Sequence, residues 1–184
     1  VVPIETDPAS GTFTIPCKRA ALRGRFLAPA GVGLKVTTGF PVEPVDGYST
    51  RPVPPEKYVP EWHLVATPPK PAEQTEFLAA MQVRRLGEQA EPEAAIEPVE
   101  AVGAHGVRFR CGDRVHLVLT RKAGTEGEIH GAGLRTDGQA AAIELGPDGK
   151  ILRAMAAGAQ VLRYKERKLL QANQPGEWAT PGKR

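Results

Sequence analysis

Short runs of alternating apolar and polar residues, each ended by glycine, proline or aspartate, limit the folds open to this chain more than any other feature. Val107, Phe109 and Cys111 alternate with Arg108 and Arg110, for example. A period of two places alternate side chains on opposite faces of a β-strand. Asp-Gly pairs follow in "TDG" and "PDG", and this dipeptide between apolar runs favours a hairpin turn. The pattern predicts consecutive antiparallel strands joined by tight turns.

The first half of the chain carries the same signal, and helical periodicity is almost absent. Strands are predicted in "GTFTIPC", "ALRGRFLAP" and "GLKVTTGF", and "TEFLAAMQVRR" is predicted to be a buried strand. The acidic segment that ends in "IEPVE" is predicted to lead into an edge strand. About a dozen short strands with no long helix predict an all-β protein, an antiparallel β-sandwich or two packed antiparallel sheets.

Proline is concentrated in one region, since residues 41–71 hold 9 of the 18 prolines. Proline cannot donate a ladder hydrogen bond, so a loop is expected at about 41–60. "EWHLVAT" within this region is predicted to form a strand. We therefore expect one β-domain over residues 1–172, followed by a mobile tail over 173–184 that is rich in proline, glycine and charge.

Charge is distributed unevenly between the two halves. Residues 1–100 carry 10 Lys/Arg against 13 Asp/Glu, whereas residues 101–184 carry 14 against 8. A basic second half attracts an anionic polymer, or it is simply a solvated surface. No window approaches the roughly 20 apolar residues that span a bilayer, so no membrane is expected as a partner. Aromatic and basic residues are not interleaved, so nucleic acid is not expected either.

The residues that could catalyse a reaction or bind a metal form no recognisable motif. The four histidines have no metal-ligand spacing, so no metal, cofactor or catalytic residue is predicted, with a zinc site assembled from distant strands as the alternative. Cys17 and Cys111 lie in strand-like segments and are expected to be buried free thiols. A disulfide between them is the alternative and requires Cα atoms within about 7 Å.

Four residues are candidates for binding a ligand. Trp62 could stack on a sugar ring beside His63, although a tryptophan is also a common core residue. Arg108 and Arg110 project from one strand face, and guanidinium groups match carboxylates and sulfates with paired hydrogen bonds. The alternative for this arginine pair is the outward polar face of a sandwich.

Several segments, taken in order, resemble a known family. "GTFTI" is followed by "LRGRFLAPAGVGLKVTTGF", a proline-rich stretch, "PEWHLVATPP" and "TEFLAAMQV", and the chain closes with "DGQAAAIELGPDGKILRAMAAGAQVLRYKERKLL". This order resembles the C-terminal β region of the heparinase II/III-like polysaccharide lyases and related alginate-lyase-like proteins. The resemblance covers roughly residues 11–170.

The resemblance implies a secreted or periplasmic parent protein that cleaves uronic-acid polysaccharides by β-elimination. In that family the catalytic Tyr, His and Asn come chiefly from a helical toroid and the early β region, and this chain shows no helical toroid. His63 matches a strand pattern only, so no catalytic role is carried over to it. The implied function is a non-catalytic C-terminal β-domain that packs against a catalytic domain and helps bind an anionic polysaccharide. A self-standing carbohydrate-binding module and a purely structural domain are the alternatives, and a buried Trp62 would favour the structural one.

Overall fold

The computed structural model describes residues 3–38, 62–87 and 94–179. Within these ranges the chain forms fifteen strands and no helix, so none of the described residues belongs to a helix able to span a membrane. The strands form three sheets, and every strand pair is antiparallel. The predicted all-β antiparallel fold is confirmed. The proline-rich region at 41–60 lies outside the described residues.

The N-terminal part of the chain forms a four-stranded sheet and a separate two-stranded ribbon. The sheet contains, in spatial order, β1 (Glu5–Asp7), β2 (Thr12–Pro16), β3 (Ala20–Ala28) and β6 (Leu78–Arg85). The ribbon pairs β4 (Gly33–Thr38) with β5 (Trp62–Thr67). The strands predicted in "EWHLVAT" and "TEFLAAMQVRR" are therefore confirmed as β5 and β6, but β6 is not the buried strand that was expected, because Met81 and Val83 on one of its faces are largely exposed.

The C-terminal part forms a nine-stranded sheet. Its spatial order is β7 (Ala95–Val99), β9 (Ala104–Cys111), β10 (Arg114–Arg121), β13 (Ala140–Leu145), β14 (Ile151–Tyr164), β12 (Leu134–Thr136), β11 (Ile129–Gly131) and β8 (Ala101–Val102), with β15 (Arg167–Ala179) also paired to β14. Because β8 directly precedes β9 and β11 contacts β9 and β10, the sheet curls back towards its first strands.

The curled sheet encloses the main core on its inner face. Directly opposed residues of an antiparallel pair share a face, and the register sets Leu117 of β10 opposite Ile143 of β13, which in turn lies opposite Ala154 of β14. All three side chains are buried in one cluster. The same cluster contains three side chains with no exposed surface: Ile129, Leu134 and Leu162.

One predicted hairpin turn is wrong. The "TDG" segment connects β12 to β13, which do not pair with each other but both pair with β14. Thr136 lies opposite Leu162 and Ala140 opposite Ala157, so the segment is a kink within one broken strand. The Asp137 carboxylate accepts hydrogen bonds from the backbone N–H groups of Gln160 and Val161, which stabilises this kink instead of a reversal.

Two further expectations differ from the structure. The tail is predicted to begin at residue 173, yet residues 173–179 continue β15, where Trp178 pairs with Ala156 of β14. Trp178 also packs against the main core, because its large apolar surface is better buried than exposed. Both cysteines are free, as expected, but Cys17 is exposed and Cys111 is only partly buried.

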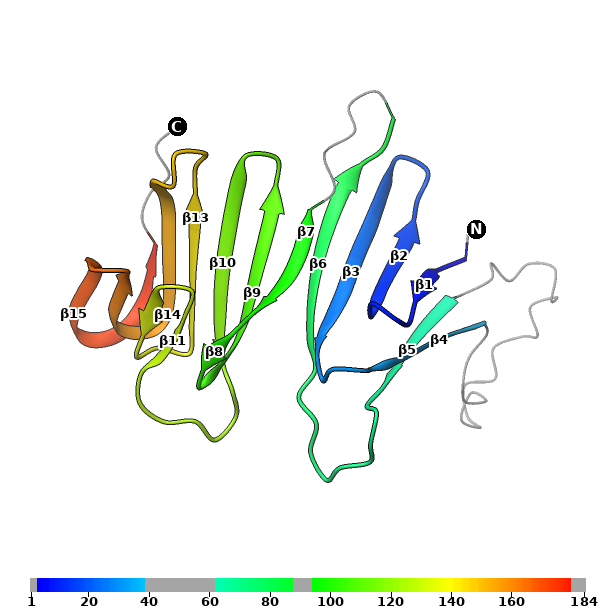
Figure 1. Cartoon of the computed structure of the whole chain (residues 1–184), viewed down its shortest axis with the longest axis horizontal. Coiled ribbons are helices and arrows are strands. Elements are labelled where there is room, and N and C mark those ends of the chain that lie inside the picture. Colours follow the sequence, from blue (N-terminus) through cyan, green and yellow to red (C-terminus); the bar gives the residue numbers. More distant parts are fainter. Residues whose placement is uncertain (1–2, 39–61, 88–93, 180–184) are drawn as a thin grey trace, which may run out of the picture.

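Figure 1 shows the four-stranded and nine-stranded sheets side by side, with β6 and β7 at the junction. A second, smaller cluster fills this junction: its buried members are Ala80, Ala94, Ile96 and Val107, with Leu27, Leu78, Phe109 and Cys111 packed against them. The junction is also bridged by side-chain hydrogen bonds. Gln82 of β6 donates from Nε2 to the Cys111 sulfur and accepts from the Ala94 N–H through Oε1.

Candidate binding site at the junction of the two sheets

A polar pocket of about 560 Å³ lies where the four-stranded sheet meets β7. We call it the β7 pocket. It is lined by Asp7, Ser10, Thr12, Arg23, Arg25, Ala94, Ala95, Ile96 and Glu97. Its volume falls in the range of about 300–1,000 Å³ that is usual for small-molecule sites, and its lining combines cationic, acidic and hydroxyl groups.

Two hydrogen bonds to backbone carbonyls hold the Arg25 side chain in the β7 pocket. Its Nε donates to the Ser10 carbonyl at 3.1 Å and its Nη1 donates to the Ile96 carbonyl at 2.8 Å. One guanidinium therefore bridges a turn of the first sheet and the edge strand of the second. Planar guanidinium groups held at two positions retain a defined orientation for their remaining N–H groups.

Arg23 lies two residues before Arg25 on β3. The register places Arg25 opposite Thr12 and Arg23 opposite Thr14. Since side chains two apart in a strand share a face, both arginines project from the same side of the sheet, towards β7. Both are partly buried.

A chain of hydroxyl groups leads to the acidic side of the pocket. Ser10 Oγ lies 2.6 Å from Asp7 Oδ2 and 2.8 Å from Thr12 Oγ1. This hydrogen bond from Ser10 is the main reason that the pKa of Asp7 is lowered, with weaker help from the backbone N–H groups of Ser10 and Ala9. Asp7 is therefore ionised at neutral pH and accepts hydrogen bonds.

Arg108 and Arg110 lie on the opposite side of β7 in the strand order. They are the cross-strand partners of Glu97 and Ala95, and Arg108 Nη1 is 3.8 Å from Glu97 Oε2. Arg110 is exposed. Strand β7 thus pairs with the strand that carries Arg108 and Arg110, and it lines a pocket together with Arg23 and Arg25.

Trp62 and His63 are not brought to this site. They lie in β5, opposite Thr38 and Thr37 of β4, and Figure 1 shows this ribbon beyond β3 and β6 from the position of β9. Both side chains are partly buried, and the buried Trp62 Nε1 has no hydrogen-bond partner among the described residues. The structure thus separates the two halves of the predicted binding set.

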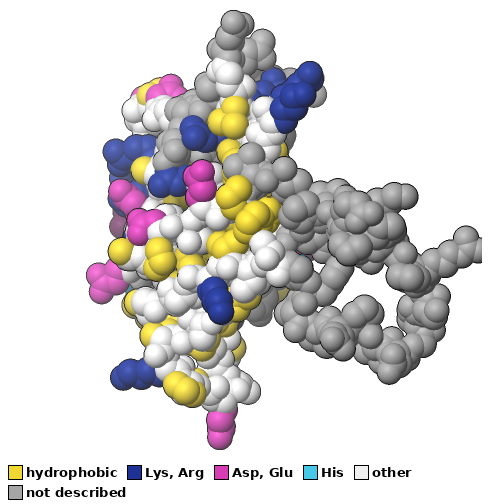
Figure 2. All heavy atoms as spheres, turned by 90° about the vertical axis from the view of Figure 1, so that its right-hand side faces the viewer, with side chains coloured by type: hydrophobic (Ala, Val, Ile, Leu, Met, Phe, Trp, Pro, Cys, Tyr) yellow, Lys and Arg dark blue, Asp and Glu magenta, His cyan; other side chains and the backbone are white. Residues whose placement is uncertain are grey.

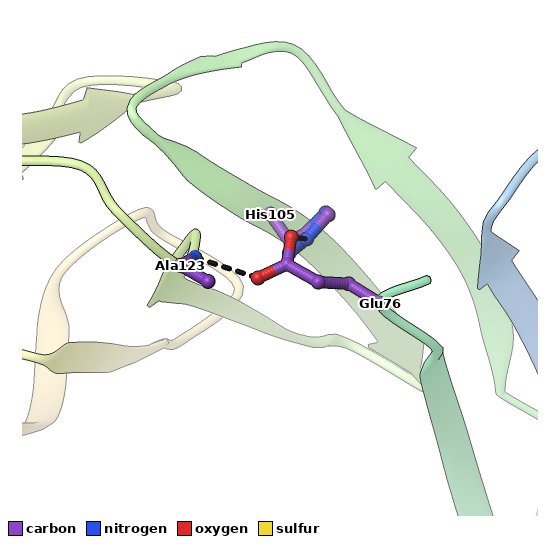
Figure 3. Close-up of polar contacts among 3 residues, drawn as sticks. All are labelled: Glu76, His105 and Ala123. Atoms are coloured by element: carbon purple, nitrogen blue, oxygen red, sulfur yellow. Dashed lines mark hydrogen bonds and ion pairs between the residues drawn. The ribbon is translucent and has the colours of Figure 1, made fainter. Parts of the chain in front are cut away.

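At the other end of the junction between the two sheets, the Glu76 carboxylate connects them (Figure 3). Glu76, just before β6, has Oε2 at 2.9 Å from His105 Nε2 of β9, and its Oε1 accepts the backbone N–H of Ala123 at 2.6 Å. The Ala123 hydrogen bond is the largest cause of the lowered pKa of Glu76, followed by the hydrogen bond with His105. Glu76 therefore ties the four-stranded sheet to two segments of the nine-stranded sheet.

In the described ranges, no group of three or more His, Cys, Asp or Glu side chains lies close enough together to hold a metal ion. No family model and no curated protein matches the chain.

Sequence reasoning identified Arg108 and Arg110 but missed Arg23 and Arg25. The signal was present, because "LRGRF" contains the same Arg-x-Arg alternation as "VRFRC". The sequence does not show that β7 lies next to Arg23 and Arg25, because only the fold places β7 against the face of β3 that carries them.

Proposed function

We propose that the chain is a non-catalytic C-terminal β-domain of a heparinase II/III-like polysaccharide lyase. In this role it packs against the catalytic domain and helps bind an anionic uronic-acid polysaccharide, in a secreted or periplasmic protein. The order of the segments over residues 11–170 supports the proposal, and the all-β antiparallel fold is compatible with it.

The observation that carries the binding role is the presence of two Arg-x-Arg pairs next to β7. Arg23 and Arg25 line the β7 pocket, while Arg108 and Arg110 face β7 across its pairing with β9. Clustered guanidinium groups raise the local concentration of an anionic ligand and bind its carboxylates or sulfates with charge-assisted hydrogen bonds. Trp62 is only partly buried and lies in the β4–β5 ribbon away from Arg108 and Arg110, so it supports neither the binding role nor, by full burial, the purely structural alternative.

An apolar surface on the four-stranded sheet supports the packing role. Met81 and Val83, on one face of β6, are 55% and 68% exposed, and the nearby Phe77 is 45% exposed. Figure 2, which views the molecule from the side of β1, shows several hydrophobic side chains exposed on this side among polar and charged ones. Large exposed apolar side chains that lie together are typical of a surface that another domain covers.

A calorimetric titration with heparin, alginate and a neutral glucan tests the proposal, with absorbance near 232 nm recorded in parallel. We expect both anionic polymers to bind, with affinity that falls as salt is added, and the neutral glucan not to bind. We expect no new absorbance, because the chain alone is proposed to lack the catalytic residues. An increase at 232 nm would identify an unsaturated uronate product and refute the non-catalytic role.

The arginine pairs are tested with a double variant. Arg108→Ala with Arg110→Ala should weaken binding of the anionic polymers by about tenfold or more, since a hydrogen bond to a charged group contributes roughly 1.5–3 kcal/mol. The matched control is Arg167→Ala, an exposed arginine of β15. Unchanged affinity in the double variant would remove the second arginine pair from the site.

A further inference from the structure

The β7 pocket has a defined polarity, with donors on one side and acceptors on the other. Arg23 and Arg25 supply the donors from β3. The hydroxyl groups of Ser10 and Thr12 and the Asp7 carboxylate supply the acceptors. Ser10 Oγ donates its hydrogen to the ionised Asp7 carboxylate, so in the hydrogen bond between Ser10 Oγ and Thr12 Oγ1 the donor is Thr12. A hydroxyl has one hydrogen and two lone pairs. Thr12 Oγ1 therefore has lone pairs with which it can accept a hydrogen bond from a ligand.

Arg25 is oriented before any ligand arrives. Two of its nitrogens are fixed on backbone carbonyls, and its Nη2 donates to no protein group in the described part of the chain. Orientation by existing hydrogen bonds reduces the entropy that a ligand loses on binding. The Nη2 hydrogens are thus available to an oxyanion at a defined position.

The acidic residues of the pocket do not cancel the preference of Arg25 for an oxyanion. Asp7 already accepts hydrogen bonds from Ser10 Oγ and the Ala9 N–H, and Glu97 lies near Arg108. The remaining acceptor capacity of Asp7, together with Thr12, suits hydroxyl groups. A ligand that carries one oxyanion and several hydroxyls satisfies both sides.

We infer that the β7 pocket binds a single sugar ring that carries one carboxylate or sulfate group, with the oxyanion at Arg23 and Arg25 and the ring hydroxyls at Thr12 and Asp7. The inference rests on the proposed function for its ligand class and adds the location and the size of the recognised unit. The pocket volume of about 560 Å³ suits one ring and is much larger than an inorganic anion needs. One acidic monosaccharide should therefore bind without a polymer.

Calorimetry with D-glucuronate, glucose 6-sulfate, glucose and inorganic sulfate tests this inference on the wild-type chain. At least one of the two acidic sugars should bind, and which of them does identifies the oxyanion. Glucose should bind at least tenfold more weakly. If inorganic sulfate binds as tightly as the acidic sugars, the pocket recognises an oxyanion alone and the sugar assignment is wrong.

Two variants locate the binding site. Arg23→Gln should weaken the acidic monosaccharide by about tenfold or more, and Arg25→Lys should weaken it too, because lysine keeps the charge but not the planar pair of hydrogen bonds. Arg167→Gln, remote on β15, should bind as wild type does. Because Arg25 bridges the two sheets, Arg25→Lys could destabilise the fold. In that case Arg23→Gln alone tests the inference, provided that its thermal midpoint equals that of wild type.

The outcomes separate this inference from the proposed function. If anionic polymers bind but no monosaccharide does, or if both variants bind the monosaccharide as wild type does, the pocket assignment is wrong and the proposed function stands. If the monosaccharide binds in an Arg23-dependent manner while heparin and alginate do not bind, the pocket assignment is right and the polysaccharide role is wrong.

Discussion

The two large sheets differ in how they obtain a core. The nine-stranded sheet curls around its own apolar residues, and three of them, Ile129, Leu134 and Leu162, have no exposed surface. The four-stranded sheet buries Phe13 of β2 and Ala21 of β3, while Met81 and Val83 of β6 remain largely exposed. One sheet encloses a core; the other contributes one side of a junction.

This difference indicates that the four-stranded sheet depends on its neighbour for stability. Leu27, Leu78 and Ala80 belong to the junction cluster, which also contains Ile96 and Val107 of the nine-stranded sheet. The bridges made by Arg25, Gln82 and Glu76 connect the same two sheets. The proposed binding site lies at this contact, so the geometry of the site and the attachment of the smaller sheet are coupled.

The largest expected effect comes from removing part of the enclosed core. Leu162→Ala deletes buried methyl groups from a site with no exposed surface, and such substitutions cost about 2–5 kcal/mol of unfolding free energy because a cavity remains. Urea denaturation followed by circular dichroism measures this loss.

The control for the core variant is Val83→Ala in the four-stranded sheet, where the side chain is 68% exposed. Surface substitutions of this kind usually change the unfolding free energy by less than about 0.5 kcal/mol. Equal losses in the two variants would contradict the comparison, since they would mean that Val83 is covered in solution as Leu162 is covered in the structure.

The sequence predicted the strands because a period of two depends only on neighbouring residues. It could not show that the two Asp-Gly dipeptides, in "TDG" and "PDG", adopt different structures. Gly149 of "PDG" has φ of +72° in the connection between β13 and β14, as a hairpin signal predicts. Asp137 of "TDG" instead accepts two N–H groups from β14, a partner more than twenty residues away. Local pattern cannot encode that choice.

The candidate site was half predictable for the same reason. Arg108 and Arg110 face β7 through a local hairpin partner, β9, and their alternation is visible in the sequence. Arg23 and Arg25 meet β7 only because the two sheets pack together, which joins residues about 70 positions apart, as in the Arg25–Ile96 hydrogen bond. Trp62 is a candidate because of its residue type, but the β4–β5 ribbon places it away from β7.

A smaller effect is expected from a close approach within the four-stranded sheet. Gly24 lies opposite Phe13, and a Cβ added to Gly24 would lie 2.2 Å from Phe13 Cζ. Gly24→Ala therefore displaces a ring that is 5% exposed, and overpacking of this kind costs about 1–3 kcal/mol. The same urea titration measures the change.

Gly176→Ala is the matched control for the glycine variant. Gly176 lies in β15 with no atom within 4 Å of an added Cβ, so the unfolding free energy should stay constant or rise slightly, because alanine has less conformational freedom to lose than glycine. A Gly24→Ala protein as stable as Gly176→Ala would mean that the Phe13 ring moves aside without loss of packing.

The smallest expected effect is local and concerns the Glu76 bridge. Glu76→Ala should leave the global thermal midpoint close to wild type and accelerate hydrogen exchange of the Ala123 amide, which donates to Glu76 Oε1. Mass spectrometry of the peptide that contains Ala123 measures the rate. Glu73→Ala, an exposed glutamate of the same loop, should leave that rate unchanged.

The pH dependence of this protection has a defined sign. The pKa of Glu76 is lowered in the folded protein, first by the Ala123 hydrogen bond and then by the one with His105. A lowered folded-state pKa contributes stability that is fully present above the unfolded value near 4.5 and is lost as the pH falls through the folded value. Protection of Ala123 in wild type should therefore approach that of Glu76→Ala in acid and exceed it at neutral pH. If the two proteins differ equally at pH 3 and pH 7, after correction for intrinsic exchange, the ionised carboxylate is not what holds the two sheets together at this end.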